Sequence, residues 1–197
     1  TYTFRSRATP NFDRTATHTI GAYASRNLNE FDLGVNYAST TYNFVPAGGE
    51  VAKVRDVVST ASCNSCHTTL AAHGGARRGM DLCVMCHAPQ YIDPDTGNSI
   101  GMTVMTHKIH MGKALPSVVA GGKYQLIGFQ QSVQDYSHIG YPMDNRNCHS
   151  CHAQEGPTAA SQARNMFRPT AASCGSCHDN INFAEGIGHP RVADDTR

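Results

Sequence analysis

The sequence predicts a mostly irregular fold with short helices, preceded by a small β-rich segment at residues 1–50. Three observations predict this fold. Apolar and polar residues alternate, as in strands, only in the N-terminal segment. From Val51 onward, glycine and proline repeatedly interrupt the chain and long aliphatic runs are lacking. The five-residue unit Cys-x-x-Cys-His occurs four times in 197 residues.

The N-terminal segment contains several candidate strands. We expect them at residues 2–4, at 18–24, around 33–37 and around 42–44, where apolar and aromatic residues alternate. The sequence Pro-Ala-Gly-Gly at 46–49 predicts a turn or a break. A sheet this small cannot bury both of its faces. We therefore expect it to pack on the rest of the chain or on another subunit.

Residues 51–197 predict short elements around the four motifs. We expect a helical turn at each motif and irregular connections between the turns. The best candidates for longer helices are residues 64–73 and 102–111. Residues 123–129 predict one strand of a small hairpin.

The four repeated units are attachment sites for c-type haem. Two thiols separated by two residues lie about one helical turn apart, so both can bond the vinyl groups on one edge of a haem, and the following histidine can bind the iron. The repeats use all eight cysteines: Cys63, Cys66, Cys83, Cys86, Cys148, Cys151, Cys174 and Cys177. The proximal histidines are His67, His87, His152 and His178. The sequence thus predicts a multihaem c-type cytochrome whose tetrahaem domain spans residues 51–197.

Zinc and disulfides are the alternatives for these cysteines. Two Cys-x-x-Cys pairs can form a tetrahedral zinc site, and eight cysteines can form four disulfides. Neither alternative explains why a histidine follows every pair. We therefore expect four covalent haems.

A haem used only for electron transfer has both axial positions filled by the protein, and this chain has seven further histidines as candidates. Seven methionines could compete, but methionine more often fills gaps in a core. His107 and His110 are three residues apart, so on a helix they share a face and can serve two adjacent haems. His73 and His189 each follow a motif closely, whereas His18 lies in a predicted strand far from any motif. His138 and His149 are expected to be structural.

The charge and composition of the chain indicate which kinds of partner and which cellular location to expect. The formal charge is +1, but each haem adds two propionates, so the tetrahaem protein would carry about −7, which makes nucleic acid an unsuitable partner. No apolar stretch reaches the length of a membrane span. Haem is attached to such motifs outside the cytoplasm, so we expect an exported protein in the periplasm, at the cell surface or outside the cell. The oxygen-rich turn at residues 93–98 could hold Ca²⁺, although a plain turn is the simpler reading.

The chain resembles the OmcA/MtrC family of cell-surface multihaem cytochromes over nearly its whole length. The similar segments are 57–63, 70–75, 83–87, 107–112, 115–122, 141–142 and 177–184. The resemblance implies a β-rich domain before haems packed in a wire, each held by two histidines. It also implies distal-ligand roles for His73, His107, His110 and His189, and it places a histidine near the position of His18.

Two features depart from the family pattern. The β domain is reduced to residues 1–50, and the fifth motif that the family carries after the position of residues 194–195 is absent from this sequence. Five candidate distal histidines for four haems leave one spare. A tetrahaem chain of this size is also similar to cytochromes that polymerise into extracellular filaments, in which a neighbouring subunit supplies one ligand. That similarity favours His18 as the donated ligand.

The sequence therefore favours an extracellular electron conduit over two rivals. Its expected partners are copies of itself, other redox proteins and extracellular electron acceptors. One rival is a discrete soluble or surface-bound shuttle. The other is a multihaem reductase, which would need one iron with an open position, and the surplus of histidines argues against it.

Overall fold

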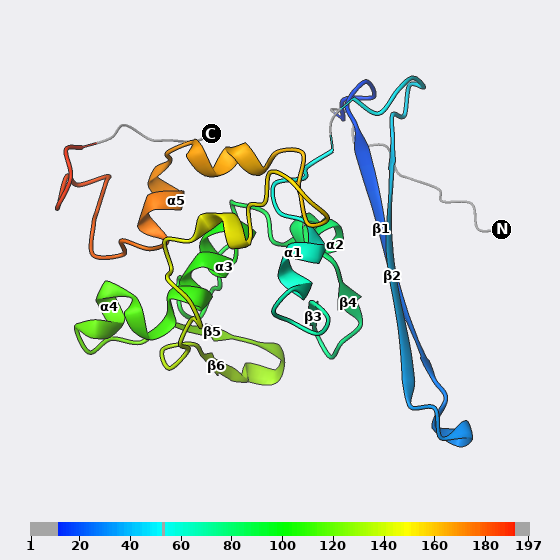
Figure 1. Ribbon diagram of the computed structural model, residues 1–197, viewed down its shortest axis with the longest axis horizontal. Helices are drawn as coiled ribbons and strands as arrows, with labels where there is room; N and C mark the ends of the chain where they lie inside the picture. Colours follow the sequence, from blue (N-terminus) through cyan, green and yellow to red (C-terminus); the bar gives the residue numbers. More distant parts are fainter. Residues whose placement is uncertain (1–11, 53, 192–197) are drawn as a thin grey trace.

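The computed structural model describes residues 12–52 and 54–191. A long two-stranded ribbon stands beside a body of short helices and loops (Figure 1). The helices are α1 (Thr60–Asn64), α2 (Met80–Cys86), α3 (Met102–Met111), α4 (Pro116–Val119) and α5 (Ala171–Gly175). The strands are β1 (His18–Asn27), β2 (Val35–Phe44), β3 (Ala71–Ala72), β4 (Arg77–Arg78), β5 (Gln125–Ile127) and β6 (Val133–Asp135). Short 3₁₀ turns occupy Asn29–Phe31, Gly112–Ala114, Phe129–Gln131, Cys148–Ser150 and Ala163–Phe167.

The ribbon is an antiparallel hairpin of β1 and β2. Its register runs from the pair His18 and Phe44 to the pair Asn27 and Val35, and a 3₁₀ turn joins the strands. The strand predicted at 18–24 is therefore confirmed. The two stretches expected around 33–37 and 42–44 belong to one continuous strand, β2. The strand expected at 2–4 lies outside the described residues.

One face of the hairpin packs on the body. Gly21 of β1 lies against α2, where a β-carbon would come within 2.6 Å of Leu82 Cδ1 and 2.7 Å of Met85 Sδ, so a larger residue would have to displace these side chains. The Arg77 guanidinium stacks 5.0 Å from the centre of the Tyr23 ring and donates to its hydroxyl at 3.2 Å. Ser39 of β2 donates to the Ala76 carbonyl at 3.0 Å. These contacts fix the hairpin beside the first two motifs.

The opposite face of the hairpin is exposed. Ile20, Ala22 and Ala24 alternate along β1 on this side, and Tyr42 and Phe44 of β2 stack on each other beyond them. Ile20 is 38% exposed and Tyr42 is 68% exposed. The expectation that such a sheet leaves one face to be covered is thus met: the body covers one face, and an apolar face points outward.

Three predictions for the body can be compared with the structure. The helix predicted at 102–111 is confirmed as α3, and the hairpin strand predicted at 123–129 is confirmed as β5, paired with β6. The helix predicted at 64–73 is wrong. The helix there is α1, which ends at Asn64, and His73 instead lies in the left-handed region with φ 53°. The two glycines after His73 continue this turn, which joins β3 to β4.

The polypeptide buries few apolar side chains in its described part. The buried hydrophobic residues are Leu82, Leu115, Tyr124, Leu126, Ala160 and Ala163. A chain of this length normally buries far more, so its elements are arranged around something other than their own side chains. None of the helices described has the length and apolar composition that a membrane span requires.

Candidate functional site

Each Cys-x-x-Cys-His unit folds into the same helical turn, as predicted. The backbone N–H of the motif histidine donates to the carbonyl of the first cysteine, at 3.0 Å for His67 and His87 and at 2.9 Å for His152 and His178. Helix α1 is capped by the Ser59 side chain, and α5 by a capping box of Thr170 and Ser173. Local hydrogen bonds therefore set the shape that brings two thiols and one imidazole together.

The cysteines form neither disulfides nor a zinc site. All eight are free thiols. In residues 12–52 and 54–191, no group of three or more Cys, His, Asp or Glu side chains converges on a metal position. Burial raises the pKa of Cys63 to about 11 and also raises the pKa of Cys83, Cys151 and Cys177. Burial thus favours the neutral thiol over the thiolate that zinc binds at these four cysteines.

Three motif histidines each face a second histidine at one common separation. The ring centroids are 6.2 Å apart for His67 and His110, 6.0 Å for His87 and His73, and 6.2 Å for His152 and His107. Each metal–imidazole bond is about 2 Å long and the ring centre lies roughly 1 Å further out, so two axial imidazoles on one iron have centres about 6 Å apart. The three pairs therefore fit an iron held between two rings.

Two of these six rings are oriented by a hydrogen bond through Nδ1. His87 Nδ1 donates to the Ile100 carbonyl at 2.7 Å, and His110 Nδ1 donates to the Thr106 carbonyl at 2.8 Å. A neutral imidazole that donates through Nδ1 keeps a lone pair on Nε2, which is the atom that binds iron. Burial lowers the pKa of His107 and of His152, which favours the same neutral form.

Helix α3 joins two of the pairs. It carries His107 and His110, which face the third and the first motif respectively, as their spacing predicted for two neighbouring sites. The thiol of Cys63 lies near those of Cys83 and Cys151, and the thiol of Cys177 lies near that of Cys148.

The fourth motif differs from the other three. Among the described residues, no histidine ring faces His178 in the way that the three pairs face each other. His189 is exposed, packs on Phe183 with ring centres 5.1 Å apart, and donates through Nδ1 to the Pro190 carbonyl at 2.7 Å. His18 lies on the hairpin, where Nε2 donates to the Asp13 carbonyl at 2.8 Å. The chain thus brings together three of the five predicted distal histidines with a motif histidine and leaves two apart.

A buried ion pair fastens the fourth motif to α3. Asp179, which directly follows His178, is 6% exposed and pairs with Lys108 of α3 at 3.1 Å. The same carboxylate accepts from the Ser117 N–H at 3.0 Å and from the Ser117 hydroxyl at 2.6 Å. Burial alone would raise the pKa of Asp179, but these hydrogen bonds and Lys108 lower it below its ordinary value. The carboxylate therefore stays ionised.

The sequence did not single out several residues that shape the site. Asp179 and Lys108 adjoin ligand candidates, so their place beside the motifs could have been noticed, but their pairing is tertiary. Tyr141 packs its ring against the His110 ring at 5.6 Å. The backbone carbonyls that orient His87 and His110 leave no sequence signal at all.

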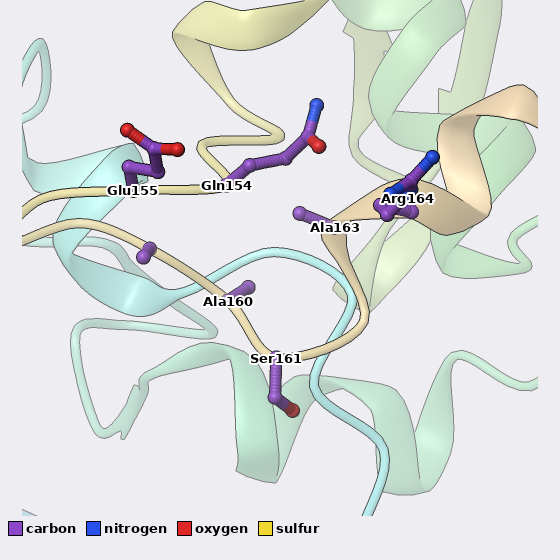
Figure 2. A pocket seen from close by; sticks show the side chains of 7 residues that line it. Gln154, Glu155, Ala160, Ser161, Ala163 and Arg164 are labelled. Carbon is purple, nitrogen blue, oxygen red and sulfur yellow. The ribbon is translucent and has the colours of Figure 1, made fainter.

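A shallow pocket of about 290 Å³ follows the third motif. Figure 2 shows Gln154 and Arg164 extending toward the same side of the loop, with Glu155 further along it. An arginine and an amide suit carboxylate groups such as the propionates of a haem. The residues that line this pocket include no nucleophile paired with a base, so the pocket alone does not indicate catalysis.

The turn considered for Ca²⁺ is a plain turn. Asp93 is 4% exposed, and its two carboxylate oxygens accept from the Asp95 N–H, the Thr96 hydroxyl and the Ile127 N–H at 2.7–3.0 Å. A carboxylate that accepts these hydrogen bonds anchors β5 to the turn and is not free to coordinate a cation.

Comparison with known proteins decides the family. Residues 55–196 match the family described as outer membrane cytochrome MtrC/MtrF-like, domains II/IV. The chain belongs to the MtrC/MtrF-like family. The resemblance seen in the sequence is thereby confirmed at the level of the family.

Individual cytochromes are also similar to this chain in sequence and in structure. The multiheme cytochrome MtrC of Shewanella baltica (strain OS185) is 32% identical over 149 residues, which are 72% of this chain and 17% of that protein. The crystal structure of the outer membrane decaheme cytochrome OmcA superposes with a TM-score of 0.70 and 28% identity, over 95% of this chain and 27% of that one. The crystal structure of MtrC from Shewanella baltica OS185 superposes with a TM-score of 0.62 and 26% identity, over 95% of this chain and 26% of that one. The chain thus spans about a quarter or less of these relatives.

Proposed function

We propose that this chain is an extracellular electron-transfer conduit that binds four haems c. The eight cysteines would attach them, and the four motif histidines would each bind one iron. The observation that carries this proposal is the set of three facing histidine pairs, all at the spacing of two axial ligands. The family supports it, because the related proteins are multihaem cytochromes of the outer membrane.

The distal ligands follow from the pairs. His110 would serve the first motif, His73 the second and His107 the third. A haem, when bound, takes up and gives off one electron at its iron. With two histidines available at each of these three sites, a bound haem would be closed to small molecules, which suits electron transfer and not substrate turnover.

The arrangement of the motifs supports a continuous path. The second and first motifs are neighbours at Cys83 and Cys63, and the third and fourth motifs are neighbours at Cys148 and Cys177. The first and third motifs both face α3. We propose that the chain holds its cofactors in this order, second, first, third, fourth, with other redox proteins or external acceptors at the two ends. We propose a location outside the cell or at the cell surface, because the related proteins are outer membrane cytochromes.

Removing one distal histidine tests the ligation. In the His107→Ala variant, we expect the reduced protein to bind carbon monoxide at one more haem than the wild type, because the iron of the third motif loses a protein ligand. The measurement is a carbon monoxide titration followed by the absorption spectrum. The intact mass of both proteins should show four covalent haems.

The matched control is His138→Ala, because His138 faces no motif histidine and should leave the titration unchanged. An unaltered titration in His107→Ala would contradict the assignment of His107. A mass that lacks four haems would contradict the whole proposal.

We further propose that the unpaired fourth motif is completed by a histidine from a second copy, so that subunits assemble head to tail into a filament. His18 is the candidate, since it lies at one end of the exposed apolar face that Ile20, Tyr42 and Phe44 share. The alternative within one chain is His189, twelve residues after Cys177 in the sequence.

The His18→Ala variant separates these ligands. We expect it to lose filaments, observed by electron microscopy, while its mass still shows four haems. Filaments that persist unchanged would remove His18 from the interface. His189→Ala is the comparison: if it alone opens a carbon monoxide site in single subunits, His189 is the fourth distal ligand and the chain acts as a discrete shuttle.

A reductase is the second candidate function, and one observation favours it: His178 has no facing histidine among the described residues. An open iron at that position could bind a substrate. Carbon monoxide binding to one haem of the assembled wild-type protein would support the reductase, and the absence of binding would support the conduit.

A further inference from the structure

The three histidine pairs differ in the angle between their rings. The planes of His67 and His110 are inclined by 75°, whereas those of His73 and His87, and of His107 and His152, are each inclined by 24°. The separations of the three pairs are nearly equal. The first motif thus has crossed imidazoles, and the second and third have nearly parallel ones.

Two contacts fix the orientation of the His110 ring. Its Nδ1 donates to the Thr106 carbonyl at 2.8 Å, which sets one edge of the ring. The ring of Tyr141 meets it edge-on, with centres 5.6 Å apart and planes inclined by 84°. An aromatic ring at this distance prevents His110 from turning parallel to His67 without losing the contact.

Tyr141 is itself held from the other side. Its hydroxyl lies near the side chains of Ser150 and Cys151 in the third motif. The loop before Tyr141 is tied to the end of α3, because the Lys113 N–H donates to the Ile139 carbonyl at 3.0 Å. Tyr141 therefore lies between His110, the proposed distal ligand of the first motif, and Cys151 of the third motif.

We propose that Tyr141 is a positioning residue that holds His110 across His67 and so makes the haem of the first motif electronically different from those of the second and third. The inference rests on the proposed ligation of that haem by His67 and His110. The relative orientation of two axial imidazoles sets the splitting of the iron d orbitals, so crossed rings give a highly anisotropic low-spin signal and a higher reduction potential than parallel rings. In the proposed order of haems, the haem of the first motif would then differ in reduction potential from its two neighbours, those of the second and third motifs.

Electron paramagnetic resonance of the oxidised four-haem protein tests this role. The wild type should show a highly anisotropic low-spin signal at large g beside rhombic signals. Tyr141→Leu should lose the large-g intensity of one haem and gain the same intensity in the rhombic signals, and a redox titration should show one potential lowered. Tyr141→Phe keeps the ring edge and should retain the signal. Tyr91→Leu, at an exposed tyrosine outside the histidine pairs, should leave the spectrum unchanged.

Each outcome bears on the inference. An unchanged large-g signal in Tyr141→Leu would overturn it, and so would loss of that signal in Tyr141→Phe, which would place the effect in the hydroxyl. Should Tyr141→Leu fail to incorporate four haems, Tyr141→Met removes the ring and fills the space with an unbranched, flexible side chain, and the same spectra apply. Failure of the ligation itself looks different. A near-infrared band typical of histidine–methionine ligation, or high-spin iron in the wild type, would overturn the assignment of His110 together with the role of Tyr141.

Discussion

The Gly112→Ala variant is expected to lose about 3 kcal/mol of stability, because a β-carbon at this position meets backbone and the backbone conformation excludes it. Gly112 ends α3 with φ 44° and ψ −115°, a combination that suits glycine. A β-carbon would lie 2.8 Å from Ile139 Cβ and 3.0 Å from the Ile139 carbonyl carbon. The segment of Ile139 cannot retreat easily, since it pairs with Lys113 and leads directly to Tyr141.

Denaturant unfolding of the purified four-haem protein measures this loss. The matched control is Gly121→Ala, at another glycine with positive φ (93°) but with open space around the added β-carbon, where only the conformational cost of about 1 kcal/mol applies. Equal losses in the two variants would show that the contact with Ile139 does not restrict α3. A much larger loss in Gly112→Ala would show that the end of the helix and the loop of Tyr141 form one packed unit.

The sequence predicted those elements whose signals are local. Gly101 and Gly112 bound the amphipathic stretch of α3, so the predicted limits at 102 and 111 agree with the structure. The helix predicted at 64–73 failed for a local reason as well. Ser59 caps a helix that begins earlier, and His73 with its two glycines adopts positive φ, which no helix contains.

The pairing of the histidines could not be predicted in the same way. The spacing of His107 and His110 indicated two neighbouring sites, but which motif each one faces depends on how the connecting loops fold. His189 follows the fourth motif by 11 residues and His73 follows the first motif by six. Only His73 lies in a tight turn that makes it face a motif histidine, His87. Tertiary packing, and not distance along the chain, decides which imidazole meets which motif.

Few apolar side chains are buried in the region of the four motifs, so hydrogen bonds between loops hold much of it together. The loop 54–59 and the loop after the third motif illustrate this. Gln162 exchanges hydrogen bonds with both the N–H and the carbonyl of Asp56, and Ser59 donates to the Thr158 carbonyl at 2.7 Å. Such contacts hold separate segments in register where large side chains would leave no room for a cofactor.

The Asp179→Ala variant is expected to cost about 3 kcal/mol, because it leaves the Lys108 ammonium partly buried without its partner and removes both acceptors of Ser117. We take the lower end of the range for buried pairs, since Lys108 keeps 18% of its side chain exposed. The control is Asp144→Ala, whose pair with Arg146 is exposed and should contribute little. Unfolding of the four-haem proteins in denaturant gives both values.

A second change distinguishes a buried charge from lost packing. Replacing Lys108 with methionine in the Asp179→Ala background removes the stranded ammonium, whose Nζ lies 5.4 Å from the centre of the Tyr124 ring, and leaves an apolar side chain that can pack on that ring. We expect the double variant to regain about 1–2 kcal/mol, a coupling typical of neighbouring groups. A double variant less stable than Asp179→Ala would instead mean that Lys108 stabilises α3 through its own contacts. In that case the ion pair would not be what fastens the fourth motif to the helix that carries His107 and His110.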